Sequence, residues 1–257
     1  MSGELRPTKA ADVAERIRER TPARLLVGRA GEAYTTSTQL QLRADHAAAR
    51  DAVWCELDLS NDLGRDIIER WNLFEVCTRA GSKAEYLLRP NLGREFTEEA
   101  AAEIARRRTT GVDFQIVIGD GLSASAVAAQ VPRLLPLLVE AAEKRGWSVG
   151  QPFVVRHCRV GIMNVVGELL RPRVVILLIG ERPGMSTAES LSAYMAYQPR
   201  RGHTDAERNL ISNIQARGVS VEEAARRVCN LAAEFLRLQV SGVAVKEALL
   251  PHPSKTG

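Results

Sequence analysis

The most restrictive feature of this sequence is an aliphatic run, Val174–Ile179, that lies between Arg173 and Gly180. A strand with one face in water alternates apolar and polar residues, whereas this run would place apolar side chains on both faces. It therefore predicts a central strand in a sheet that helices cover on both sides. Sheets of that kind are mostly parallel and occur in α/β proteins.

The residues around this run repeat a strand–helix pattern. Phe114–Ile118 and Phe153–His157 are short apolar runs typical of buried strands, and an Ala- and Leu-rich helix is expected from Ser123 onward. Gly161–Leu170 is expected to be the helical crossover to the aliphatic strand. Residues 111–250 therefore predict an open, mainly parallel α/β sheet flanked by helices.

Two more helices are expected before the end of this domain. Glu189–Tyr197 is predicted to be helical, and Ser220 with Glu223 three residues later forms a capping box that starts a second helix. Residues 251–257 are expected to be a tail.

Residues 1–110 are expected to be a mostly helical extension packed on the main domain. Its two strand-like runs, Leu73–Thr78 and Glu85–Leu88, flank a turn-forming stretch and are predicted to pair as a hairpin. The segments predicted to be helical are Thr8–Glu19, Thr36–Leu59 and Thr97–Arg107.

Charge and cysteine usage exclude several classes of function. Lys and Arg total 35 and Asp and Glu total 31, so the net charge is only +4 and is spread along the chain. Nucleic acid is therefore not an expected partner. The 4 cysteines form no CxxC pair, and no apolar run is long enough to cross a membrane. A reduced, cytoplasmic protein without a structural metal is the default expectation.

Ligands of open α/β sheets bind at the carboxyl ends of the strands, where the sequence places three loops. The first, Gly119-Asp120-Gly121 with Ala124, fits the dinucleotide fingerprint GxGxxA. The acidic residue that the fingerprint needs at the end of the next strand is missing, because that strand ends at His157. The turn is thus open to three interpretations: an NAD-type site, a site for another nucleotide-like ligand, or a turn that only needs glycine.

The other two loops carry further candidates. One follows His157 and contains Arg159 and Val160, and the other contains Glu181 between Gly180 and Gly184. The Glu181 carboxylate could accept hydrogen bonds from ribose or amide groups. The alternative is a self-contained surface loop in which Glu181 pairs with Arg182.

No group of residues suggests a catalyst. The histidines are dispersed, and Ser123 and Ser125 have neither a nearby base nor a GxSxG elbow. The sequence therefore indicates a binding domain, and no catalytic or metal-ligating residue is assigned.

Five segments occur in a specific order and spacing. They are Ala44–Val53, Ile116–Ala124, Val174–Gly184, Ile211–Ile214 and Ala232–Gly242. Together they resemble the small (light) subunit of ethanolamine ammonia-lyase, and the resemblance extends from about Arg20 to Val245.

This resemblance implies a Rossmann-like domain that holds adenosylcobalamin, a cobalt cofactor, at the interface with a large catalytic subunit. The complete enzyme is then a carbon–nitrogen lyase of ethanolamine degradation, which forms acetaldehyde and ammonia by a radical mechanism. The chain is expected to be inactive alone and to assemble with the ethanolamine ammonia-lyase large subunit as six copies of each. The location implied is cytoplasmic, with packaging in a bacterial microcompartment as an option.

The family positions that touch cobalamin correspond to Val160, Glu181 and Leu210. The family usually has Cys where Leu210 stands, so an apolar contact can persist but a thiol contact cannot. The chain also lacks the Asp-x-His-x-x-Gly motif of base-off cobalamin proteins. The cofactor's own dimethylbenzimidazole is therefore expected to stay on cobalt.

Two rival classes remain at this point. One is a nucleotide-binding (NAD-type) oxidoreductase domain, and the other is an interaction subunit that touches no cofactor. Trp54, Trp71 and Phe74 are candidate anchors for a partner chain, since buried aromatic residues often dominate interfaces. The alternative is that they hold the N-terminal helices on the domain.

Overall fold

The computed structural model describes residues 9–20, 25–107, 109–184 and 187–247. Its α-helices are α1 (Lys9–Arg20), α2 (Thr36–Trp54), α3 (Arg65–Trp71), α4 (Lys83–Leu88), α5 (Glu98–Arg107), α6 (Ala124–Glu143), α7 (Ile162–Leu170) and α8 (Val221–Leu238). Its strands are β1 (Arg29–Ala30), β2 (Ala33–Tyr34), β3 (Phe74–Cys77), β4 (Phe114–Gly119), β5 (Phe153–Arg156), β6 (Val174–Gly180), β7 (Leu191–Tyr197) and β8 (Asn209–Ile214). Short turns of other helix types are η1 (Leu59–Leu63), η2 (Leu92–Arg94), η3 (Asp205–Glu207) and η4 (Gly242–Ala244).

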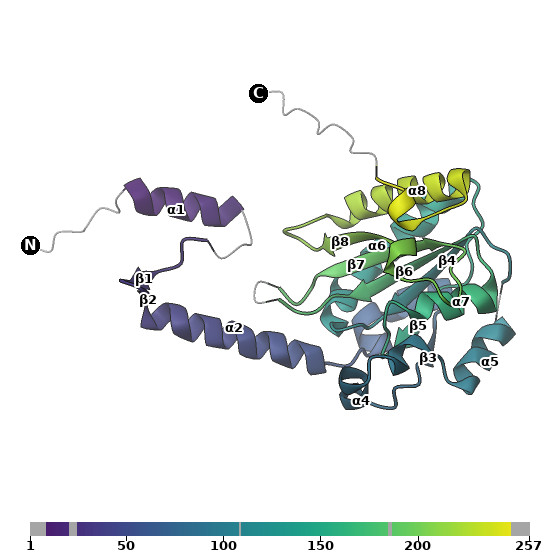
Figure 1. Cartoon of the computed structure of the whole chain (residues 1–257), viewed down its shortest axis with the longest axis horizontal. Helices are drawn as coiled ribbons and strands as arrows, with labels where there is room; N and C mark the ends of the chain where they lie inside the picture. The colour runs from purple at the N-terminus through teal and green to yellow at the C-terminus, as the bar shows by residue number, and fades with distance from the viewer. Residues whose placement is uncertain (1–8, 21–24, 108, 185–186, 248–257) are drawn as a thin grey trace, which may run out of the picture.

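The main sheet has six strands in the order β3-β5-β4-β6-β7-β8 (Figure 1). The strands β3, β5, β4 and β6 run parallel to one another, whereas β7 pairs antiparallel with both β6 and β8. The prediction of a mixed α/β fold with a mainly parallel sheet flanked by helices is confirmed.

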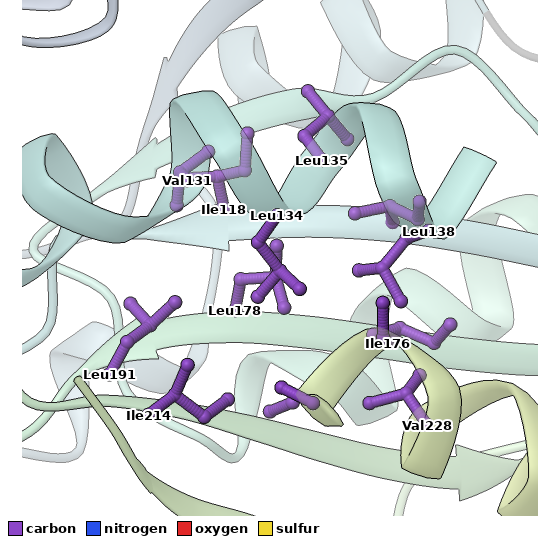
Figure 2. Packing of buried hydrophobic residues seen from close by; sticks show 14 of the residues in the cluster. Ile118, Val131, Leu134, Leu135, Leu138, Ile176, Leu178, Leu191, Ile214 and Val228 are labelled. Carbon is purple, nitrogen blue, oxygen red and sulfur yellow. The ribbon is translucent and has the colours of Figure 1, made fainter. Parts of the chain in front are cut away.

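The aliphatic strand β6 lies inside the sheet, and every residue from Val174 to Gly180 is buried. Val174, Ile176 and Leu178 pack with α6 and α8 on one face of the sheet. The residues between them point to the other face, where α5 and α7 lie. Figure 2 shows the first of these layers, with the side chains of α6 and Val228 of α8 packed around the strands. The absence of a polar face in the sequence thus reflects burial on both sides.

The hairpin prediction for residues 73–88 is wrong. Phe74–Cys77 does form a strand, but it pairs in parallel with β5 at the edge of the main sheet. The second run belongs to helix α4, whose first turn is capped by the Ser82 hydroxyl, the acceptor for the Glu85 N–H at 3.2 Å. A serine N-cap overrides the weak strand propensity of such a short segment.

The helix predicted at Glu189–Tyr197 is also wrong, because residues 191–197 form strand β7. Leu191, Ala193 and Met195 are buried in the α6–α8 core. Ser192 and Tyr194 point to the opposite face by the twofold alternation of a strand. Pairing with β6 and β8 on its two sides decides the structure of this segment.

The first two helices lie away from the sheet layers (Figure 1). Helix α2 begins at the Thr35 cap and has no buried residue. Large apolar side chains are exposed along this region, among them Leu40 at 59% and Trp54 at 52%. None of the helices in the described ranges is long and apolar enough to cross a membrane.

Candidate functional site

The α7 side of the sheet is incompletely covered at β7 and β8. Tyr194 of β7 is half-buried and packs against the α7-side core. Leu210 of β8 lies directly opposite Tyr194 in the antiparallel register, so both side chains are on the same face. The Leu210 side chain is 45% exposed. This part of the sheet therefore presents an uncovered surface with an apolar and an aromatic side chain.

Glu181 belongs to the same face of the sheet, just beyond the carboxyl end of β6. Its carboxylate accepts hydrogen bonds from the Ser190 hydroxyl at 2.7 Å and from the Ser192 hydroxyl. Ser192 is two residues before Tyr194 on β7, so the two share a face. No ion pair joins Glu181 to Arg182 in the described part of the chain, so the contacts are not those of a self-contained Glu–Arg loop. The serines hold the carboxylate in place and leave it acceptor capacity, since an ionised carboxylate can accept about four hydrogen bonds.

Val160 lies at the carboxyl end of β5, where helix α7 begins. It is half-buried and lines a cavity of about 550 Å³ that Tyr194 also lines. The wall of the cavity is made by η2, the first half of α7 and the connection from β7 to β8. The three positions that the resemblance implied are thus each related to Tyr194: Val160 through the shared cavity, Leu210 through cross-strand pairing, and Glu181 through Ser192.

Tyr194 was not identified from the sequence. Its hydroxyl lies where burial raises its pKa above the usual value, and the nearby carboxylates of Asp205 and Glu181 act in the same direction. Tyr194 therefore keeps its proton at neutral pH and can donate a hydrogen bond. The signal that could have found it is the alternation of buried Leu191, Ala193 and Met195 with other residues, which is typical of a strand.

The Gly119-Asp120-Gly121 turn is filled by this chain. Gly121 has φ +56°, and a Cβ there would collide with the carbonyl oxygen of Gly180. A Cβ on Gly180 would in turn collide with the carbonyl oxygen of Ser123. The glycines are needed because the ends of β4 and β6 touch each other. The turn has no room for a phosphate against its backbone, and the NAD-type alternative is not favoured.

The Asp120 side chain has a structural role in this turn. It accepts hydrogen bonds from the backbone N–H groups of His157 at 2.9 Å and Cys158 at 2.8 Å. Its partner is Lys83, whose ammonium lies 3.9 Å away, and both side chains are less than 5% exposed. Burial lowers the pKa of Lys83, and the charge of Asp120 opposes that shift. This buried pair fixes the loop that carries Val160.

The histidines do not gather into a reactive group. His157 is buried with Nδ1 2.9 Å from the Ala80 carbonyl oxygen, while His203 lines the cavity near α7. Ser123 caps α6, and its hydroxyl donates to the carbonyl oxygen of Ala188 at 2.5 Å. Within the described ranges, no three His, Cys, Asp or Glu residues are placed to hold a metal ion.

Comparison with known proteins gives one consistent result. Residues 11–246 match the family model described as ethanolamine ammonia-lyase light chain (EutC). The ethanolamine ammonia-lyase small subunit of Clostridium acetobutylicum is 40% identical over 226 residues, which is 88% of this chain and 91% of that protein. The small subunit from Clostridioides difficile is 40% identical over 93% of this chain and 79% of its own length. The one from Listeria monocytogenes is 40% identical over 90% of this chain and 77% of its own length.

Proposed function

Because the chain belongs to the family of ethanolamine ammonia-lyase light chains, the small subunits of a lyase, we propose that it holds adenosylcobalamin against a large catalytic subunit. The reaction of the complete enzyme would convert ethanolamine into acetaldehyde and ammonia. The observation that supports this role is that Glu181 and Leu210 lie on the uncovered sheet face that carries Tyr194, while Val160 lines a cavity with the same tyrosine. A Rossmann-like description of residues 111–250 is part of the same proposal.

The residues on this face fit a cobalamin. The corrin is a broad plate with amide side chains at its rim, and the uncovered surface of β7 and β8 is partly apolar. Leu210 and Tyr194 would support the plate by packing, and Glu181 would accept a hydrogen bond from an amide N–H. Leu210 can support the corrin although the family usually has Cys at this position, since an aliphatic side chain also gives a packing contact.

The contribution of this chain is placement rather than chemistry. When bound, adenosylcobalamin supplies the radical chemistry by which ammonia is removed. Glu181, Leu210 and Tyr194 would orient the plate, and the loop fixed by Asp120 would hold Val160 against it. The partner would close the open side and exclude water.

The large subunit is the proposed partner, in an assembly of six copies of each chain with an option of microcompartment packaging. The surface proposed for it is the N-terminal part of residues 1–110, where Leu40 and Trp54 are exposed. Trp71 and Phe74 are different, because Trp71 packs against the core and Phe74 stacks on Phe153 with ring centroids 5.3 Å apart. Trp54 is therefore the remaining aromatic anchor for the partner.

Glu181→Ala is expected to weaken cobalamin binding by the assembled two-subunit enzyme. Losing a hydrogen bond to a charged acceptor costs about 1.5–3 kcal/mol, which corresponds to about ten- to hundredfold in the dissociation constant. Glu181→Gln is expected to do the same, because one of its two polar atoms becomes a donor facing Ser190 and Ser192. Titration followed by the cobalamin absorption spectrum measures the effect.

The matched control is Glu189→Gln, in the same loop but with an exposed side chain. It is expected to leave the dissociation constant unchanged. If both Glu181 variants assemble normally and bind cobalamin like the wild type, Glu181 is only a loop residue and this part of the proposal is wrong.

Trp54→Ala is expected to weaken assembly with the large subunit by about thirtyfold or more, as the loss of an interface hot spot of about 2 kcal/mol would. Its melting temperature should change little, because the side chain is 52% exposed in the isolated chain. Leu88→Ala serves as control, since Leu88 is 83% exposed on α4. Analytical ultracentrifugation of the two chains together measures assembly, and an unaltered association constant for the Trp54 variant would contradict the proposed surface.

A further inference from the structure

The cavity beside Val160 is lined by more arginines than carboxylates. Its walls carry the side chains of Arg94, Arg159, Arg201 and Arg208, together with those of Glu95 and Asp205. The chain as a whole is only mildly basic, so this is a local concentration of positive charge. Such a concentration in a concave site attracts anions.

Two of these arginines are neutralised within the chain. Arg201 forms a bidentate ion pair with Glu95, with both N–O distances at 2.9 Å, and also pairs with Glu168 at 3.0 Å. Arg208 pairs with Asp205. Arg94 and Arg159 have no carboxylate partner among the residues that the structure describes. The cavity therefore retains an excess of positive charge.

The chain holds Arg159 and Arg94 in place by neutral contacts. The Arg159 guanidinium lies 4.1 Å from the centroid of the Tyr86 ring, and one of its N–H groups donates to the Tyr86 carbonyl oxygen at 3.3 Å. The aliphatic part of Arg94 packs on Gly161, where a Cβ would come within 3.0 Å of it. Both guanidinium groups are thus positioned beside the start of α7 without being neutralised.

Three nitrogen atoms of cavity-lining residues have no hydrogen-bond partner in the part of the chain that the structure describes. The Nε atoms of Arg159 and Arg208 are buried without a hydrogen-bond partner, and so is Nδ1 of His203. The Arg208 side chain is only 7% exposed, and its other nitrogens are used on Asp205 and Asn164. These three atoms are covered by the chain itself, so they do not contact a ligand directly, and the donors that face the cavity are those of Arg94 and Arg159.

Helix α7 adds to the same field. Val160 and Gly161 at its start line the cavity. The N–H groups of its first turn donate to the backbone carbonyl oxygens just before it, so the helix contributes its field rather than free donors. The amino end of a helix carries a partial positive charge and favours an anion. Two separate features of the cavity, namely the arginines without a carboxylate partner and the helix start, therefore favour an anion.

We propose that this cavity binds the phosphodiester of the nucleotide tail of cobalamin, with Arg159 and Arg94 as its donors. This inference rests on the proposed function. The phosphodiester is the anionic group of cobalamin, while the rest of its periphery consists of neutral amides. The cavity adjoins Tyr194 and is thus continuous with the face that would carry the corrin. Binding of the tail here would leave Glu181 and Leu210 for the ring.

The test compares two neutral corrinoids, cyanocobalamin and dicyanocobinamide, which lacks the phosphodiester and the base. Each is titrated against the assembled two-subunit complex carrying Arg159→Met, Arg94→Met or both. The methionine keeps much of the aliphatic stem and removes the charge. We expect the double variant to bind cyanocobalamin about ten- to hundredfold more weakly, as for loss of charge-assisted hydrogen bonds, and cobinamide with wild-type affinity.

The control variant is Arg133→Met, on α6 and paired with Glu222 at the surface. It is expected to bind both corrinoids normally. An equal loss of affinity for the two corrinoids in the arginine double variant would overturn the inference, and so would no loss for either. Unchanged cobinamide binding also shows that the variant is folded and assembled.

Two further ligands distinguish binding of the phosphodiester from binding of the base or of a free anion. Cobinamide phosphate, which lacks the base, is expected to be as sensitive to Arg159→Met as cyanocobalamin, and insensitivity would assign the cavity to the base and overturn the inference. Inorganic phosphate is expected to compete weakly with cyanocobalamin but not with cobinamide. Tight phosphate binding with no effect on cyanocobalamin would assign the cavity to a free anion instead. If the wild-type complex binds neither corrinoid, the proposed function itself fails.

Discussion

The purified chain, mixed with adenosylcobalamin and ethanolamine but no large subunit, is expected to release no ammonia above the uncatalysed background. The hydroxyls of Ser123 and Ser125 are hydrogen-bonded to each other and to Ala188, and His157 is turned toward Ala80. The chain thus has no base poised beside a nucleophile in the part that the structure describes. The face proposed for the cofactor is also open, whereas radical chemistry needs a site closed to water.

Adding the large subunit is expected to restore turnover in proportion to the complex formed. A coupled assay for acetaldehyde, run at increasing ratios of large to small subunit, measures this. The large subunit alone is the control and is also expected to be inactive, because it would lack the face around Tyr194. Turnover by this chain alone would contradict its assignment as a placement subunit, and full turnover by the large subunit alone would contradict its cofactor role.

Asp120→Ala is expected to lower the free energy of unfolding by about 3–5 kcal/mol, the usual cost of leaving one partner of a buried ion pair uncompensated. The substitution leaves the Lys83 ammonium buried without its carboxylate partner, since the Lys83 side chain is 4% exposed. It also removes the acceptor of the His157 and Cys158 N–H groups. Urea unfolding of the isolated chain, followed by circular dichroism, measures the change.

The control is Glu140→Ala, because the pair of Glu140 with Lys144 lies at the surface, where solvent screens it and it should contribute little to stability. A second variant, Asp120→Ala with Lys83→Met, should lose less than the sum of the two single changes, since no charge is then left buried. If Asp120→Ala costs no more than Glu140→Ala, the buried pair does not hold this loop.

The stability of the Asp120→Ala variant should also depend on pH in a characteristic way. Burial already lowers the pKa of Lys83 below its usual 10.5, and removing Asp120 takes away a charge that opposes this shift. Between the lowered folded pKa and 10.5 the unfolded state then binds more protons than the folded state. Stability should therefore rise with pH across that window, and more steeply in Asp120→Ala than in the wild type.

The sequence by itself determined the elements whose signals are local. Val174–Ile179 could only be a strand covered on both faces, because it offers no polar face, and β6 is buried throughout. Hydroxyl caps likewise fixed helix starts: Thr97, Ser123 and Ser220 each accept a backbone N–H at the start of the predicted helix. The five spaced segments were sufficient to identify the family, which the match over residues 11–246 confirms.

The tertiary structure decided the short segments with mixed signals. Residues 191–197 contain Ala, Met and Tyr, which suit a helix or a strand, and only pairing with β6 and β8 makes them a strand. Glu85–Leu88 was read as a strand but belongs to a capped helix, while β3 found its partner in β5 rather than nearby. For such short segments the contacts available in the folded chain outweigh intrinsic propensity.

In the candidate site, too, the sequence identified single residues and the tertiary structure decided how they are arranged. Val160, Glu181 and Leu210 came from a resemblance in sequence, but their arrangement around Tyr194 depends on the register of β7 with β8. The cavity next to them is assembled from η2, α7 and the β7–β8 connection, segments far apart in the chain. A sequence read locally carries no information on which charges meet across such distances. Only the folded chain shows that Arg201 and Arg208 find carboxylates there while Arg94 and Arg159 do not.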